Sequence, residues 1–411
     1  MTGHLVPGPD PDGSTLLTTP AVESLLRAAV DHAGGHLDSW RLDHVDANPG
    51  LSTTATYLAT VTWSYGTRSE LLGVSARSSG PATSDGNAEI FADGDREVAV
   101  WLYPNDPDLP GLARAAYPDR MAELITSQGL VGRPVSPGQV SLRMIGYRPR
   151  RRAVVRVDVT DPRRTFYVKV LRGTLFADVL HRHRILLDAG VPAPEIAGTT
   201  DDNLRILAEL PGRPLARAVF DPVEPCTAAN LIGVLDTMPI SVAALERRPP
   251  WSEAVNHYVQ MVSAAMPSQA GRLAWMSQTI GQGLSAIPRG EEATHGDFHE
   301  GQVHVADGRV CGILDVDTIG PGRRADDLAC MVAHLSTIQR MDAQQASRLH
   351  HLIRTWVPVF DERVDPTELR LRAAAVIISL ATGPYRSQEP HWEHETVMIL
   401  DAAEALVRQV V

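Results

Sequence analysis

Apolar and polar positions form several short strand-like runs in the first third of the chain. The first of these runs alternates small or polar with apolar residues, as in a strand that is buried on one face. These runs cover residues 55–63, 69–77 and 96–104. A helical apolar period precedes them at residues 21–33, and another follows at residues 112–127. A helix followed by antiparallel strands predicts a small α+β module.

A second group of strands begins near Ser141, beyond a glycine- and proline-containing linker at residues 130–137. The predicted strands cover residues 140–149, 154–159, 165–171 and 204–210, and the first two are joined by an arginine-rich turn. A helical pattern at residues 175–189 separates the last two strands and ends at Gly190.

The pattern from residue 214 to the end is mostly helical. One β-like insertion interrupts it at residues 302–317, where the turn sequence ADG predicts a hairpin. Residues 1–15 are rich in proline, glycine and aspartate, so we expect this start to be disordered.

Composition and charge narrow the possible functions. The hydrophobic fraction of 44% and the charged fraction of 21% are ordinary for a globular protein. A net charge of −11 does not favour a nucleic-acid partner, although it suits a cationic small molecule. The longest apolar stretch near the C-terminus, residues 373–381, is too short to span a membrane. We therefore expect no membrane partner.

Three widely spaced cysteines, Cys226, Cys311 and Cys330, form no CxxC pair. Their spacing indicates apolar residues of a reducing compartment rather than a disulfide framework or a zinc site. The N-terminal residues lack the basic and apolar regions of a signal peptide. Both features predict a cytoplasmic location.

Lys169 is the only lysine in the chain, against 37 arginines. A stray lysine in an arginine-favouring sequence would be expected on an exposed polar stretch, whereas this one lies between Val168 and Val170 in an apolar strand. A lysine ammonium is a compact charge that can contact phosphate oxygens. With no P-loop sequence around it, the lysine fits the arrangement in which a mid-strand lysine follows two strands whose turn covers the phosphates.

The segment HGDFHEGQVHV at residues 295–305 carries further candidates for phosphoryl transfer. In this pattern Asp297 is suited to orient an attacking hydroxyl and to accept its proton. Gln302, five residues later, offers an amide oxygen that can bind a metal ion. Asp315 ends the next strand and is a candidate Mg²⁺ ligand. An isolated HGD would be better explained as a turn with a capping aspartate. The order of the lysine strand, loop, hairpin and aspartate therefore carries the prediction.

The sequence HGDFHEGQVHVADGRVCGILDVDTIGPGRRADDLA resembles the core of the aminoglycoside phosphotransferase and choline kinase-like superfamily, which shares the protein-kinase fold. The resemblance spans roughly residues 138–411. The HGDxHxGQ loop is similar to those of actinobacterial maltokinases and glucosamine kinases, which also carry an N-terminal cap.

The resemblance implies an α+β fold of two lobes behind a small α+β cap at residues 16–137. The β-rich N-lobe and hinge would cover residues 138–212, and the helical C-lobe residues 213–411. It implies an enzyme that uses ATP and Mg²⁺ to phosphorylate a hydroxyl of a small molecule. A sugar or aminosugar is the preferred acceptor, and an aminoglycoside-type antibiotic is the close competitor.

The resemblance also implies roles for individual residues. Lys169 would contact the α and β phosphates, Asp297 would be the catalytic base, and Gln302 and Asp315 would hold Mg²⁺. Backbone groups of the hinge would meet adenine, and a DDLA aspartate would be structural. The remaining candidates are Glu209 and Leu210 in the hinge, Gly146 and Arg151 in the phosphate-covering turn, His299 and Glu300 as substrate contacts, and Asp327 as the structural aspartate. Asp317 would face the same side as Asp315 if the strand continues, and it would then bind the metal or support its ligands; a turn aspartate is the equal alternative.

The chain departs from the family pattern in places. The helix after Lys169 offers Asp178, His181 or His183 where a glutamate partner is usual, and Gln302 replaces an asparagine. The phosphate-covering turn lacks a glycine-rich run, and its arginines either contact phosphates or are simply solvated. These departures keep open the alternative of a nucleotide-binding, pseudokinase-like regulatory module without turnover. The sequence leaves the oligomeric state unknown.

Overall fold

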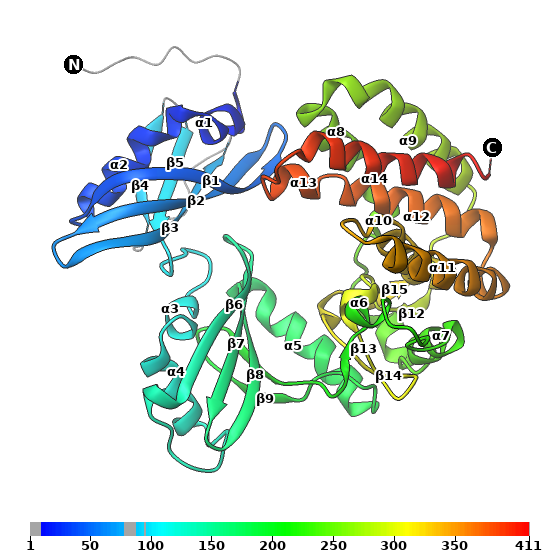
Figure 1. Cartoon of the computed structure of the whole chain (residues 1–411), viewed down its shortest axis with the longest axis horizontal. Helices are drawn as coiled ribbons and strands as arrows, with labels where there is room; N and C mark the ends of the chain where they lie inside the picture. The colour runs from blue at the N-terminus through cyan, green and yellow to red at the C-terminus, as the bar shows by residue number, and fades with distance from the viewer. Residues whose placement is uncertain (1–9, 78–87, 94–95, 411) are drawn as a thin grey trace. The chain divides into compact units, whose positions relative to one another are not determined.

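A computed structural model describes residues 10–77, 88–93 and 96–410. The chain divides into two compact units (Figure 1). The first contains Met1–Phe176, Ile196–Leu207 and Tyr385–Pro390, and the second contains Ala177–Glu195, Ala208–Pro384 and His391–Val411. The boundaries expected at residues 138 and 213 stay predictions. The N-terminal segment that was expected to be disordered covers residues 1–15. Residues 1–9 lie outside the described residues, and a helix begins at Ser14.

The first unit begins with two helices packed on a five-stranded antiparallel sheet. The helices α1 (Ser14–Thr18) and α2 (Glu23–His32) share a core with the sheet, which includes Leu26 and Tyr57. The strand order is β1-β2-β3-β5-β4. The strands are β1 (His36–Asn48), β2 (Ser52–Trp63), β3 (Gly66–Arg77), β4 (Glu89–Asp93) and β5 (Arg96–Leu102).

The helix predicted at residues 21–33 and the strands β2, β3 and β5 are confirmed. The outer strands β1 and β4 were missed. Strand β1 lies at the edge of the sheet and buries only Leu37 and Val45. Its polar sequence therefore lacks the apolar alternation by which the other strands were found.

The single helix predicted at residues 112–127 is wrong. The structure has α3 (Leu112–Ala115) and α4 (Pro118–Ser127). Tyr117 between them is extended, with φ −119° and ψ 129°, because a residue before proline is driven out of the helical region.

A second five-stranded sheet in this unit confirms the predicted strand set and carries Lys169. Its order is β6-β7-β8-β10-β9, and β9 was not predicted. The three long strands are joined by antiparallel hairpins, and α4 packs on their buried face. The strands are β6 (Val140–Arg148), β7 (Arg152–Thr160), β8 (Arg163–Leu171), β9 (Ile196–Thr199) and β10 (Leu204–Ala208).

The β6–β7 turn is anchored by Asp106, which follows β5 and is 1% exposed. Its carboxylate accepts hydrogen bonds from Tyr147 Oη and the Arg150 backbone N–H, both at 2.7 Å. The Arg150 guanidinium in turn pairs with Asp108 at 3.0 Å. Of the two alternatives for the arginines of this turn, simple solvation is therefore excluded for Arg150, whose side chain is buried and paired.

The second unit is mostly helical, as predicted. Helix α5 (Gly173–Asp188) enters it from the first unit, and α12 (Pro366–Leu380) is buried on nearly every side. Helices α9, α10 and α14 pack around α12, so it forms the centre of the core. The other helices are α6 (Leu215–Ala218), α7 (Ala228–Asp236), α8 (Val255–Ala265), α9 (Ala270–Leu284), α10 (Arg324–Thr337), α11 (Ala343–Arg363), α13 (Gly383–Arg386), which runs into the first unit, and α14 (Trp392–Val407).

Short strands position the candidate loops of this unit. The predicted hairpin is confirmed as β13 (Val303–Ala306) and β14 (Arg309–Ile313), with Asp307 and Gly308 at φ 51° and 73° in the turn. Strand β12 (Glu292–Thr294) pairs with β15 (Gly320–Gly322) and brackets the HGD segment. Strand β11 (Arg213–Pro214) pairs with β13.

Within the described part of the chain, no helix is both long and apolar enough to cross a membrane.

Asp106 is expected to stabilise the first unit by satisfying buried donors of the β6–β7 turn. Asp106→Ala leaves Tyr147 Oη and the Arg150 N–H without this acceptor, which should cost about 2–4 kcal/mol of unfolding free energy. Urea unfolding followed by fluorescence measures the loss. The exposed Asp201→Asn should stay within about 0.5 kcal/mol of the wild type. Equal stability of Asp106→Ala and the wild type would contradict the anchoring role.

Candidate active site

The backbone of the HGD loop, residues 295–297, is hydrogen-bonded to the carboxylate of Asp327. The backbone N–H of His295 donates to Asp327 Oδ2 at 3.0 Å, and that of Gly296 donates to Oδ1 at 2.9 Å. Gly296 lies at φ +82°, and a Cβ atom there would be 2.7 Å from Thr318 O. A glycine is therefore required on both backbone and steric grounds.

Asp327 itself is fully buried and is balanced by Arg324, one turn earlier on α10. Arg324 Nη1 lies 2.9 Å from Asp327 Oδ2, and Nη2 donates to the carbonyls of Leu235 and Ala293. Burial raises the pKa of Asp327, while the guanidinium and the two loop N–H groups act in the opposite direction. The expected structural role of Asp327 thus has a physical basis in this unit, although sequence reasoning did not single out Arg324.

His295 ties the start of the loop to the end of the hairpin. Its ring is buried, with Nε2 2.8 Å from Leu314 O and Nδ1 accepting from the Asp297 N–H at 3.4 Å. This pattern assigns the ring proton to Nε2. Thr318 Oγ1 donates to His295 O at 2.9 Å, so both sides of the loop are fixed.

Asp297 is half-buried at the end of this fixed backbone. The thiol of Cys330 on α10 lies 3.8 Å from Asp297 Oδ1. Burial raises the pKa of the Cys330 thiol well above its usual value, so it stays neutral beside the carboxylate. A half-buried carboxylate on a rigid loop can hold a hydroxyl and accept its proton.

His299 and Glu300 lie next to Asp297 and meet His334 of α10. The rings of His299 and His334 stack with centroids 3.9 Å apart. Burial would lower the pKa of His299, but Glu300 and the carboxylates of Asp297 and Asp315 outweigh it and raise that pKa. Burial, reinforced by His299, lowers the pKa of His334 to about 4. No sequence signal pointed to His334, which lies 35 positions from His299.

Gln302 and Asp315 are brought together through the backbone. The Leu314 N–H donates to Gln302 O at 2.7 Å, which places Asp315 beside the loop. Gly301 N–H donates to His299 Nδ1 at 3.1 Å, and the amide nitrogen of Gln302 lies 3.1 Å from His299 Nε2. The amide oxygen of Gln302 and the Asp315 carboxylate are the hard oxygen donors that suit Mg²⁺.

The interpretation that Asp317 faces the same side as Asp315 depended on the strand continuing, and it does not. Strand β14 ends at Ile313, Asp315 takes a left-handed conformation at φ 52°, and Val316–Thr318 form a 3₁₀ turn. Asp317 is buried in that turn.

Lys169 and Gly146 share one face of the second sheet. Gly146 pairs with Val154, which pairs with Lys169, so the three lie in one row across β6, β7 and β8. Two strand spacings separate the outer pair by about 10 Å. Val168 and Val170 face the opposite, packed side. The space where a Gly146 side chain would project is open.

Arg151 is close to this row in sequence but is engaged elsewhere in its own unit. It lies 3.5 Å from Asp46 of β1 and is 57% exposed. In the second unit, Glu209 is exposed just after β10, and Leu210 packs against Gly312 of the hairpin.

The residues of α5 that were candidates for the usual glutamate partner of Lys169 lie in different surroundings. Asp178 accepts from Arg182 at 2.8 Å and from Arg248 at 2.9 Å. His183 is buried with Nε2 2.8 Å from Pro194 O, whereas His181 is exposed. The two histidines therefore point to different sides of the helix.

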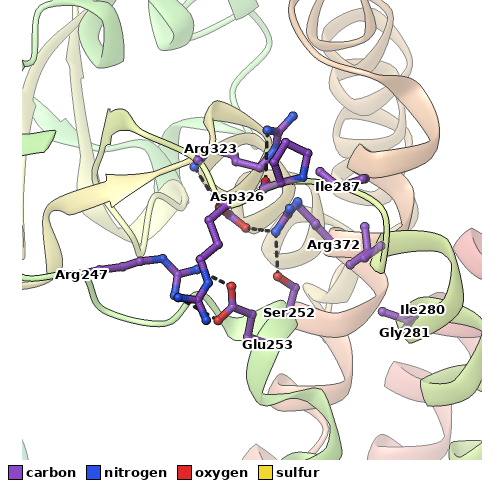
Figure 2. Close-up of a pocket in the computed structure, with 13 residues that line it drawn as sticks. Arg247, Ser252, Glu253, Ile280, Gly281, Ile287, Arg323, Asp326 and Arg372 are labelled. Atoms are coloured by element: carbon purple, nitrogen blue, oxygen red, sulfur yellow. Dashed lines mark hydrogen bonds and ion pairs between the residues drawn. The ribbon is translucent and has the colours of Figure 1, made fainter.

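A cavity of about 110 Å³ lies under the DDLA segment, and Figure 2 shows its lining. Arg372 of α12 pairs with Asp326 at 2.6 Å and donates to Ser252 at 2.9 Å. Arg323 is paired with Glu368, and Arg247 is paired with Glu253. Because each of these arginines has a carboxylate partner, the cavity is a charge network that ties α10 to α12. The two adjacent aspartates therefore have different roles. Asp326 links α10 to α12, and Asp327 binds the backbone of the HGD loop.

A second cavity of about 270 Å³ lies beside the HGD loop. Trp251 and Tyr258 line it together with Gly296 and Thr318. Its lining, among the described residues, does not include Asp297.

Fold and loop together define a phosphotransferase with a protein-kinase-like α+β fold. The model of the phosphotransferase enzyme family matches residues 149–364, more than half of the 411 residues. The chain therefore belongs to that family, as the sequence resemblance predicted. No curated protein matches the chain.

Solved structures similar to this chain have low sequence identity. A thermostable mutant of aminoglycoside phosphotransferase APH(4)-Ia is 16% identical, with 66% of this chain and 96% of that chain covered and a TM-score of 0.47. Choline kinase LicA from Streptococcus pneumoniae is 12% identical, with coverages of 70% and 98% and a TM-score of 0.47. Spectinomycin phosphotransferase APH(9)-Ia is 14% identical, with coverages of 70% and 97% and a TM-score of 0.47.

Two carboxylates that meet Arg324 provide a matched test of the loop anchor. Asp327→Asn breaks a buried ion pair and should lower the unfolding free energy by about 3–5 kcal/mol. Asp236→Asn removes a half-exposed carboxylate 3.5 Å from the same arginine and should cost less than about 1 kcal/mol. Thermal and denaturant unfolding of both variants gives the comparison. Similar losses in the two would contradict the assignment of Asp327 as the anchor.

Proposed function

We propose that this protein is an ATP- and Mg²⁺-dependent O-phosphotransferase that transfers the γ-phosphate to a hydroxyl of a small molecule. The observation that carries the proposal is the loop held by Asp327, which presents Asp297 beside Gln302 and Asp315. A catalytic base and two oxygen ligands for a metal ion on a fixed backbone suit phosphoryl transfer.

Further residues are proposed as contacts for the nucleotide. Lys169 supplies the only ammonium group of a side chain, and the open sheet face at Gly146 leaves room for phosphates beside it. Arg151 is a further candidate because its guanidinium is largely exposed. Backbone groups of Glu209 and Leu210 are the proposed adenine contacts.

In the proposed reaction, Asp297 orients the acceptor hydroxyl toward the γ-phosphorus. The hydroxyl oxygen forms a bond to phosphorus, the bridging oxygen leaves with ADP, and the hydroxyl proton passes to the Asp297 carboxylate. Gln302 and Asp315 would hold Mg²⁺, which would neutralise charge on the phosphates. Lys169 would add a positive charge to the phosphates.

A sugar or aminosugar is the proposed acceptor, on the basis of the HGDxHxGQ loop. His299 and Glu300 are the proposed substrate contacts, and the net charge of −11 suits a cationic acceptor. An aminoglycoside-type antibiotic is the alternative acceptor. We further propose a cap at residues 16–137, lobes at residues 138–212 and 213–411, and a cytoplasmic location.

Asp297→Asn should abolish turnover while preserving nucleotide binding. We expect at least a hundredfold or so lower rate, because the amide cannot accept the proton. ADP release with Mg²⁺-ATP is measured across sugars, aminosugars, aminoglycosides and choline, and ATP affinity is measured by calorimetry. Asp307→Asn, the same substitution in the nearby hairpin turn, should retain wild-type turnover.

An acceptor-dependent signal that survives in Asp297→Asn would refute the role of Asp297. ATP binding by the wild type with no ADP release for any acceptor would instead favour the regulatory module without turnover.

Lys169→Arg should also reduce turnover, by roughly tenfold or more, because a planar guanidinium does not replace a compact charge at a buried site. The matched change Arg164→Lys, at an exposed position of the same strand, should have no effect. Steady-state rates with ATP as the varied substrate test both variants. Wild-type kinetics in Lys169→Arg would mean that the lone lysine has no catalytic importance.

A further inference from the structure

The cavity under the DDLA segment has more arginines than carboxylates in its lining (Figure 2). The whole lining belongs to the second unit. Its two carboxylates are those of Glu253 and Asp326. Its arginines come from four separate segments of the chain, and they are Arg247, Arg289, Arg323 and Arg372.

Three of these arginines are balanced by three carboxylates. Arg247 donates to Glu253 at 3.1 Å. Glu368, which is buried beside the cavity, is shared by Arg323 at 2.5 Å and Arg372 at 2.7 Å. The third carboxylate is the first aspartate of the DDLA segment, which also pairs with Arg372. These contacts leave one arginine of the lining without a counter-charge.

That arginine is Arg289, which is exposed between Pro288 and Gly290. It has no hydrogen bond or ion pair with any of the residues that the structure describes. The hydrogen bond from Arg247 lowers the pKa of Glu253, and the charge of Arg289 acts in the same direction. The unbalanced positive charge is therefore felt by the groups that line the cavity.

Arg372 adds a donor that the protein itself does not satisfy. Its side chain is only 8% exposed. The Nε group donates to Glu368, and Nη1 donates to Asp326 and Ser252. Nη2 has no hydrogen-bond partner among the described residues, but it is not sealed from solvent, so its N–H groups open on the cavity that the side chain lines.

The cavity has room for a small ligand and a way in. Its volume of about 110 Å³ is several times the roughly 10–15 Å³ that one water molecule needs. Gly281, Pro288 and Arg289 are exposed at its edge, so the cavity can be reached from solvent. A tetrahedral oxyanion is compact, and its oxygens accept the N–H groups of guanidinium side chains.

We propose that this cavity binds a small oxyanion with the chemistry of phosphate, held by Arg289 and Arg372. The anion would balance the free charge of Arg289 and accept from Arg372 Nη2, while the other arginines keep their carboxylate partners. The site uses no residue of the proposed phosphoryl-transfer site. It goes beyond the proposed function and does not rest on it.

Binding at this place would strengthen the junction between α10 and α12. Arg372 joins the two helices through Asp326, and a ligand that binds only the folded protein stabilises it. Because Asp327 follows Asp326 on α10, the helix that anchors the HGD loop would be stabilised as well. Free phosphate and the phosphate group of a small monoester share the required chemistry.

Calorimetric titration with inorganic phosphate tests the site. The untagged full-length protein, without nucleotide or Mg²⁺ and at constant ionic strength, is compared with Arg289→Gln and with Arg184→Gln. We expect a wild-type Kd of about 1 mM or lower and at least about fivefold weaker binding in Arg289→Gln. The exposed Arg184 of α5 is the control, and its variant should bind as the wild type does.

A third variant separates this cavity from the proposed nucleotide site. Lys169→Gln should retain the phosphate affinity of the wild type. Loss of phosphate binding in Lys169→Gln together with wild-type binding in Arg289→Gln would overturn the inference. No binding by the wild type, or equal affinity in all the proteins, would overturn it too, and none of these results bears on phosphoryl transfer.

Glycerol phosphate, titrated in the same way, distinguishes the two sources of the anion. Binding of both ligands that weakens in Arg289→Gln would support a site that admits monoesters. The same weakening for inorganic phosphate alone would support a site for the free anion.

Selenate, a tetrahedral oxyanion that scatters X-rays anomalously, locates the ligand without any variant. Crystals of the wild-type protein grown with selenate should show an anomalous peak beside Arg372 Nη2. Peaks confined to other places would contradict the site.

Discussion

The buried carboxylate of Asp327 is the constraint on which the candidate site depends. Removing a carboxylate from water is costly unless its charge and its lone pairs find partners. Arg324 supplies the charge, and the N–H groups of His295 and Gly296 satisfy the oxygens. The same bonds therefore stabilise the helix core and fix the backbone immediately before Asp297.

Further bonds extend this constraint from the loop to the hairpin that follows it. His295 reaches Leu314 O through its ring, and the Leu314 N–H returns to Gln302 O. Both bonds join segments that are separated by a hairpin in the sequence. They place Asp297, the proposed catalytic base, on one connected frame with the amide of Gln302 and the carboxylate of Asp315. Such a frame is the preorganisation that electrostatic catalysis requires.

Much of the fold was predictable where local pattern and tertiary environment agree. The three long strands around Lys169 and the β13–β14 hairpin carry strong alternation or turn signals, and both are confirmed. The edge strand β1 was missed because its exposed positions are polar. The helix at residues 112–127 was predicted too long because the conformational cost of the residue before Pro118 was overlooked.

The site shows the same division. The loop residues from Asp297 to Gln302 could be proposed from the sequence because they are contiguous in it. Arg324 was missed, although its spacing of three residues from Asp327 was a usable signal. His334 and Asp106 carry no local signal, since their importance arises only when distant segments fold together. Asp317 was placed by assuming that a strand continues, which the left-handed turn at Asp315 prevents.

That Asp327 holds the HGD loop in one conformation is tested most directly by amide hydrogen exchange in the wild-type protein. The amides of His295 and Gly296 should exchange as slowly as those of the buried helix α12, because both are bonded to a fully buried carboxylate. The amide of Gly308 in the hairpin turn should exchange rapidly. Exchange of His295 and Gly296 at the rate of Gly308 would show that the loop is not held from beneath.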